Sequence, residues 1–201
     1  MARCYSASMR NRHPSVIPSA VDVWLVSDAR NDLVLEDVLA HLPRGCGLIF
    51  RHYHLVPTER QVRFKHLARI ARRHGHAIVL SGSARQARKW GADGAYGPPD
   101  ALSQGPACLR LVTAHSLKEM GQALRARADA VLLSPVFATR SHPGARALGP
   151  VRYRLLAAKS KVPIIALGGM TAARAGRLGS AKWAAIDGIC DKATRRIPKD
   201  S

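Results

Sequence analysis

The chain has 201 residues, 47% of them hydrophobic, which is enough for one sizeable core and leaves no room for a second domain. Its apolar runs are strand-sized and fall well short of the roughly 20 residues that cross a bilayer, so we exclude a membrane-spanning protein. Lys and Arg number 32 against 13 Asp and Glu, and the net charge of +19 attracts polyanions and phosphorylated substrates without indicating a fold.

The N-terminal segment, residues 1–20, combines Arg3, Arg10 and Arg12 with prolines and contains no apolar run. We predict a flexible basic tail rather than a secretory signal, and one folded domain over residues 21–201. The cysteines lie far apart and form no C-x-x-C pair; they are Cys4, Cys46, Cys108 and Cys190. This spacing predicts free thiols in a reducing cytoplasm and argues against a metal–thiolate site.

Short apolar runs that alternate with helical spacing dominate the rest of the chain. The predicted strands are Val21–Val26, Gly47–Phe50, Ala77–Leu80, Gly94–Tyr96, Leu109–Thr113, Ala130–Ser134, Ile164–Leu167 and Trp183–Ile186. Most of the intervening segments carry apolar residues at helical spacing, as at Leu67, Ile70 and Ala71, although the helices after the fourth and eighth strands are expected to be short or missing. Eight such units favour an α/β fold, a compact (β/α)8 TIM barrel, over an open doubly wound sheet.

A barrel would place functional side chains just after each strand, at the C-terminal rim. Gly168 and Gly169 follow the seventh strand, a frequent phosphate-binding position in this fold, and glycine amides can approach a phosphate closely. An ordinary tight turn is the alternative interpretation of this pair.

Two segments carry a resemblance to a known family. Residues 131–144 read VLLSPVFATRSHPG, and residues 164–170 read IIALGGM. Together with the segment VTAHS at 112–116, they resemble the thiamine phosphate synthase family, including its thiazole tautomerase branch. The resemblance implies a small phosphorylated thiazole or pyrimidine as ligand. It also implies that Thr113, Thr139, Ser141, Gly168 and Gly169 bind phosphate or substrate.

Departures from the family pattern fall on the residues that would bind pyrophosphate and magnesium. Arg51 matches the arginine of the family's Q-x-R-x-K motif, here Ile49 to Tyr53, and His142 stands at the catalytic lysine. Gly82 stands where the family has a magnesium ligand, and Asp100 is a candidate for the second one. Because Mg²⁺ depends on few protein ligands, losing one puts Mg²⁺ binding in question.

Two reactions follow from the resemblance. The synthase reaction expels pyrophosphate from an aminopyrimidine. Here the positive charge that it needs would come from Arg51, Arg140, His142 and Arg146. The tautomerase reaction moves a proton on a carboxythiazole phosphate, and His115 stands at the matching histidine. A histidine that only hydrogen-bonds the barrel rim is the alternative for His115. Asp187 stands where the family has a serine beside the phosphate, so its carboxylate would repel phosphate unless it turns away.

Two other interpretations stay open. The basic residues at 60–73 and 85–89 fit solvated helix faces, but a non-catalytic or regulatory barrel that binds nucleic acid or another polyanion is the main alternative function. His52 and His54 would share one face of a strand and could form a metal pair, although no third ligand is near them in the sequence. The sequence leaves the oligomeric state open, a homodimer included.

Overall fold

The computed structural model describes residues 20–140, 144 and 146–194. Residues 1–19 of the predicted tail therefore lie outside the described residues, as do the candidate site residues Ser141 and His142.

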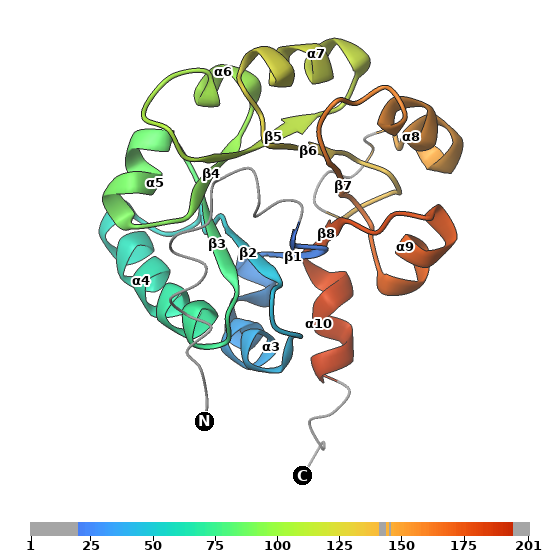
Figure 1. Ribbon diagram of the computed structural model, residues 1–201. Helices are drawn as coiled ribbons and strands as arrows, with labels where there is room; N and C mark the ends of the chain where they lie inside the picture. The colour runs from blue at the N-terminus through green and yellow to red at the C-terminus, as the bar shows by residue number, and fades with distance from the viewer. Residues whose placement is uncertain (1–19, 141–143, 145, 195–201) are drawn as a thin grey trace, which may run out of the picture.

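Eight parallel strands close into a barrel in the order in which they occur in the chain. The strands are β1 (Val23–Val26), β2 (Gly47–Phe50), β3 (Ala77–Ser81), β4 (Gly94–Gly97), β5 (Leu109–Ala114), β6 (Ala130–Leu133), β7 (Ile164–Ala166) and β8 (Trp183–Ala185). Each predicted strand corresponds to one of these, and β8 pairs with β1 to complete the barrel. The predicted (β/α)8 TIM barrel is confirmed (Figure 1).

The helices form a ring outside the strands (Figure 1). They are the 3-10 helix η1 (Ala29–Val34) and α3 (Leu35–His41), α4 (Pro57–Arg73), α5 (Ala84–Trp90), α6 (Pro99–Leu102), α7 (Leu117–Arg125), α8 (Gly149–Ala157), α9 (Ala172–Leu178) and α10 (Asp187–Thr194). The helix after β4 is one turn long, as predicted, whereas the helix after β8 is present as α10. Among the described residues, no helix is long and apolar enough to span a membrane.

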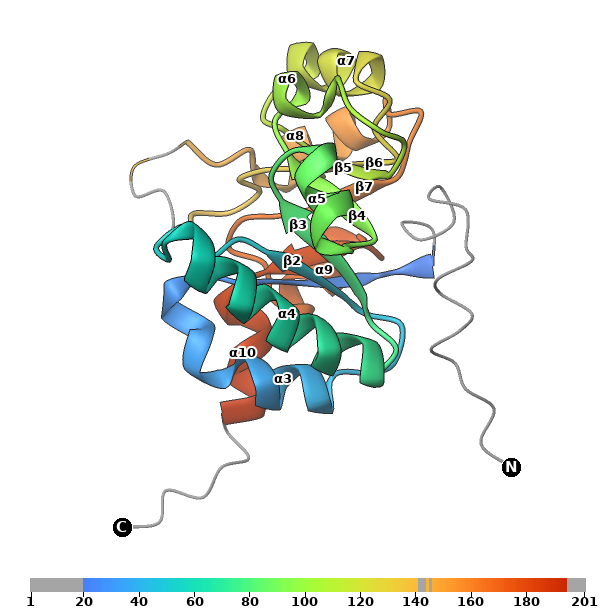
Figure 2. The same cartoon turned by 90° about the vertical axis from the view of Figure 1, so that its left-hand side faces the viewer.

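The apolar side chains divide into two layers because successive strand residues point to opposite faces of the sheet. One layer fills the barrel interior with residues such as Trp24, Ile49 and Leu111, and the other lies between the strands and the helices. On the outer side, α3 packs against both α4 and α10 (Figure 2). Both layers are closed to water, so the rim of the barrel is where polar side chains can meet a ligand.

Gly47 makes room for the largest side chain of the barrel interior. A Cβ atom built on Gly47 would lie 2.3 Å from the indole of Trp24, which is fully buried beside it. Trp24 pairs in register with Gly47 across β1 and β2, so the largest side chain of the interior lies over the residue without a side chain.

Candidate functional site

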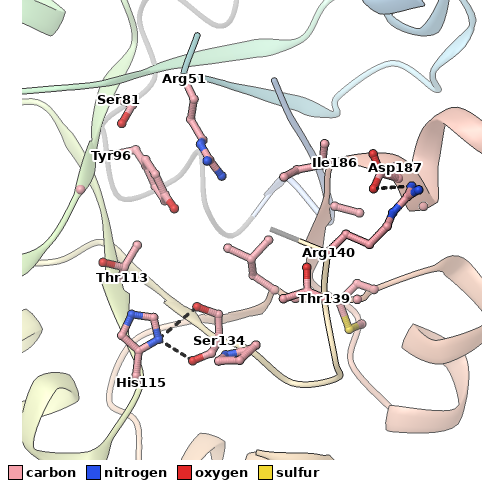
Figure 3. A pocket seen from close by; sticks show the side chains of 18 of the residues that line it. Arg51, Ser81, Tyr96, Thr113, His115, Ser134, Thr139, Arg140, Ile186 and Asp187 are labelled. Carbon is pink, nitrogen blue, oxygen red and sulfur yellow. Dashed lines mark hydrogen bonds and ion pairs between the residues drawn. The ribbon is translucent and has the colours of Figure 1, made fainter. Parts of the chain in front are cut away.

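A cavity of about 950 Å³ opens at the C-terminal ends of the strands. We call it the rim pocket. Arg51 follows β2, Tyr96 belongs to β4, and Thr113 and His115 come from the end of β5 and the residue just beyond it; all four line the pocket (Figure 3). The described residues that the sequence predicted as catalytic or phosphate-binding all line it; they are Arg51, Thr113, His115, Thr139, Gly168 and Gly169.

The turn after β7 depends on its two glycines. Gly168 has φ of +94° and Gly169 has φ of +61°, backbone conformations that residues other than glycine rarely adopt. A Cβ atom would lie 2.7 Å from Pro135 at the first position and 2.5 Å from the Ala138 carbonyl oxygen at the second. The turn is thus held tightly against the β6 loop, and neither glycine amide donates to an acceptor among the described residues. Both amides are therefore available to donate hydrogen bonds to a phosphate group.

His115 is held by hydrogen bonds on both its backbone and its ring. The backbone amide donates to the Glu119 carboxylate at 2.9 Å, and ring Nδ1 lies 2.6 Å from the carbonyl oxygen of Ser134. A carbonyl oxygen can only accept, so the neutral ring carries its proton on Nδ1 and leaves the lone pair of Nε2 free. An unprotonated imidazole nitrogen such as Nε2 can act as a base and take up a proton from a ligand.

Positive charge dominates the described lining of the pocket. Arg51, Arg140, Arg146 and Arg174 all line it, and Asp187 is the one acidic residue among the described lining residues. The Asp187 carboxylate lies 2.9 Å from Arg140 (Figure 3). It also lies 3.4 Å from Arg30, so two guanidinium groups balance its charge. The predicted repulsion of phosphate by Asp187 is thereby reduced through ion pairing.

Arg51 is anchored at the end of β2. Its amide donates to Ser27 Oγ at 2.8 Å, and its guanidinium lies 3.5 Å from the Asp28 carboxylate. Burial alone would raise the pKa of Asp28, but hydrogen bonds from Arg30 and the charges of Arg30 and Arg51 outweigh it and lower that pKa. Asp28 therefore stays ionised at neutral pH and keeps Arg51 in place.

Two tyrosines that the sequence did not single out also line the pocket. The Tyr53 hydroxyl is 2.5 Å from Ser81 Oγ, which puts a phenol ring where the family motif would have a lysine. Tyr96 is nearly buried, and burial raises the pKa of its phenol to about 12. The available signal for Tyr96 was its place at the C-terminal end of the predicted fourth strand, where this fold carries its functional side chains.

The pocket does not fit the magnesium ion that the resemblance implies. Mg²⁺ is held mainly by carboxylate oxygens. Gly82 has no ligand atom, Asp100 is exposed on α6 outside the described lining, and Asp187 begins α10 after β8, away from the Gly82 position after β3. We therefore derive no step through Mg²⁺.

Comparison with known proteins agrees with this geometry. The family described as thiamine monophosphate synthase matches residues 23–190 of the chain, nearly the whole barrel. The chain belongs to the thiamine monophosphate synthase family. This confirms the resemblance inferred from the segments around Thr113, Thr139 and Gly168.

Individual members of the thiamine monophosphate synthase family are distant relatives. "Thiamine-phosphate synthase" of Geobacillus thermodenitrificans (strain NG80-2) is 28% identical over 187 residues, covering 86% of this chain and 80% of the relative. "Putative thiamine-phosphate synthase 2" of Aquifex aeolicus (strain VF5) is 36% identical over 75 residues. That match covers 37% of this chain and only 40% of the relative.

Solved structures share the fold. Thiamine phosphate pyrophosphorylase from Pyrococcus furiosus superposes with a TM-score of 0.71 at 21% identity, over 85% of this chain and 88% of that one. The 2-keto-3-deoxy-6-phosphogluconate aldolase of Zymomonas mobilis ZM4 superposes with a TM-score of 0.58 at 16% identity, over 88% and 85%. At such identities these likenesses show the barrel and say nothing of the chemistry.

Proposed function

We propose that this chain transfers a proton on a carboxythiazole phosphate, the tautomerase reaction of its family, rather than displacing pyrophosphate. Membership of the family supports a role in thiamine biosynthesis. The observation that carries the proposal is the hydrogen bond from His115 Nδ1 to the Ser134 carbonyl oxygen, because it leaves Nε2 as a free base beside the pocket.

The proposed reaction needs one base, one phosphate site and no metal. His115 Nε2 takes the proton as the carbon–hydrogen bond of the thiazole breaks, and the imidazolium then returns a proton to another atom of the conjugated system. The phosphate lies at the Gly168–Gly169 amides with Arg140 and Arg146, which supply positive charge at the same rim. The ligand begins and ends with the same atoms and electrons, so no further reactant is required.

The same pocket is poorly equipped for the synthase reaction. Departure of pyrophosphate requires metal or strong positive charge to stabilise the leaving group. On the side of β2 and β3, Tyr53 and Ser81 are hydrogen-bonded to each other, and the described lining offers no free carboxylate for a metal there. We therefore expect coupling of pyrimidine pyrophosphate to thiazole phosphate to be slow or absent.

Replacing His115 by Asn tests the proposal. Asn keeps a polar side chain but cannot act as a base near pH 7, so exchange of the thiazole proton with deuterium, followed by NMR, should slow by about 10² to 10⁴-fold. His41→Asn is the matched control, because His41 Nδ1 also bonds a backbone carbonyl, at 2.9 Å from Asp37, but on α3 outside the described pocket lining. The control should retain the full exchange rate.

Normal exchange in His115→Asn, at an unchanged melting temperature, would rule His115 out as the base. Absence of exchange in the unmodified chain at every pH near 7 would remove the tautomerase reaction itself. Formation of thiamine phosphate at about 1 per second or faster would favour the synthase reaction instead.

A further inference from the structure

The histidine pair next to Arg51 has a third potential ligand that comes from another loop. His52 and His54 lie in the turn between β2 and α4, and not on a strand as the sequence suggested, because β2 ends at Phe50. Asp32 belongs to η1, which follows the neighbouring strand β1. One ligand atom from each of Asp32, His52 and His54 lies within 4.8 Å of the other two.

We propose that Asp32, His52 and His54 bind a divalent transition-metal ion of the Zn²⁺ class, at a site outside the rim pocket. Two imidazoles and one carboxylate are a donor set that such ions use, with water completing the coordination. Zn²⁺ holds its nitrogen and oxygen ligands at about 2.0 to 2.2 Å, so two ligands of one ion lie about 3 to 4 Å apart. The 2.7 Å between His52 Nε2 and Asp32 Oδ1 would therefore widen slightly on binding, whereas the ligand atom of His54, which lies within 4.8 Å of both, would move closer to them.

His52 is already oriented for this role. The ring is fully buried, Nε2 lies 2.7 Å from Asp32 Oδ1, and Nδ1 lies 2.8 Å from Ser27 Oγ. A carboxylate can only accept, so without an ion Nε2 donates to Asp32 and Nδ1 accepts from the Ser27 hydroxyl. An ion bound at Nε2 would displace that proton, and the ring would then carry a proton on Nδ1 that it can donate to Ser27 Oγ. A second hydrogen bond of this kind orients most histidine ligands of metal sites. The backbone of His52 has φ of +41°, which is rare for any residue but glycine.

His54 and Asp32 complete the set of ligands from two different segments. The His54 ring lies with its centroid 5.2 Å from that of His52, is exposed, and has no hydrogen-bond partner among the described residues, so it can turn toward an ion. Asp32 is fixed by Arg63, whose Nε donates to Asp32 Oδ1 at 2.8 Å and whose guanidinium also pairs with Glu36. Hydrogen-bonded carboxylates are usual among metal ligands.

The site lies on the segment that carries Arg51 and Tyr53, one residue to either side of His52. An ion held there would tie the β2–α4 turn to the β1–η1 segment. The inference does not depend on the proton-transfer chemistry proposed above, since His115 takes no part in the site.

Titration of tag-free, chelator-treated full-length chain with Zn²⁺ by calorimetry, and with Co²⁺ by visible absorption, tests the site. We expect binding of one ion with an affinity in the micromolar range or tighter, and a loss of at least about tenfold in His54→Ala. That variant changes an exposed side chain, so it should fold normally. Asp32→Asn should lose binding to a similar extent, with melting temperature monitored.

His66→Ala is the matched control, because His66 is another exposed histidine nearby, with Nε2 3.4 Å from Glu36. It should bind Zn²⁺ like the unmodified chain. Equal affinity in His54→Ala and the unmodified chain would overturn the proposal. Loss of binding in His66→Ala alone, or no binding of either metal by the unmodified chain, would overturn it as well.

Discussion

Tyr96 shows how burial shapes one side chain of the rim pocket. Because burial raises the pKa of its phenol to about 12, Tyr96 keeps its proton throughout the neutral range and can donate a hydrogen bond to a bound ligand. Tyr96→Phe should therefore weaken binding of carboxythiazole phosphate by about 2- to 10-fold, the loss expected for one neutral hydrogen bond. Calorimetry at pH 6 and pH 9 should give the same ratio at both, since the phenol ionises at neither.

Tyr153→Phe is the control for the loss of a buried tyrosine hydroxyl. Tyr153 belongs to α8 and is also buried, but its hydroxyl lies 3.0 Å from Ser180 Oγ, and the residue is outside the described pocket lining. Its replacement should lower stability and leave ligand affinity unchanged. Equal affinity for ligand in Tyr96→Phe and the unmodified chain would exclude a contact between Tyr96 and the ligand.

Paired strands determine where a glycine is required. Gly47→Ala should destabilise the fold by about 1 to 3 kcal/mol, because the new methyl group on β2 would overlap the Trp24 indole on β1. Gly176→Ala is the matched change in α9, where a Cβ atom meets nothing within 4 Å, and it should stabilise the helix by about 0.5 to 1 kcal/mol. Urea denaturation of the two variants measures both effects, and equal stability for the two would contradict this account of the interior.

The charge of the whole molecule bears on the alternative function, binding of a polyanion. The helices α4 and α5 are neighbours in the outer ring (Figure 1). Their exposed basic residues include Lys65, Arg69, Arg73, Arg85, Arg88 and Lys89. A net charge of +19 predicts retention on nucleic acid that falls steeply with salt. Carboxythiazole phosphate at 100 times its Kd should instead stabilise the fold by about 2.7 kcal/mol.

Melting temperatures and retention on immobilised nucleic acid, both measured between low and physiological salt, separate the two functions. A melting temperature that carboxythiazole phosphate still raises at physiological salt supports the small-molecule site. Tight nucleic-acid binding at that salt, without protection by the thiazole phosphate, would favour the regulatory barrel.

The local pattern of apolar residues in the sequence was sufficient to predict the barrel and many of the residues at its rim. Buried parallel strands are short apolar runs whatever packs on them, so all eight were predicted to within about two residues of their observed ends. A residue at or just after the end of such a strand lies at the rim, and among these the resemblance to the family pointed to Arg51, Thr113 and His115. The roles of these residues, and of Ser141 and His142 outside the described residues, stay predictions.

The sequence by itself therefore determined the fold, the family and the side of the barrel that carries the site. Tertiary structure alone decided which side chains meet there: Arg30 with Asp187, Tyr53 with Ser81, and Asp32 with His52. These partners lie 157, 28 and 20 residues apart in the chain and belong to segments at the ends of different strands. Strand periodicity follows from the backbone, but the direction of a loop side chain depends on what the neighbouring loops place beside it.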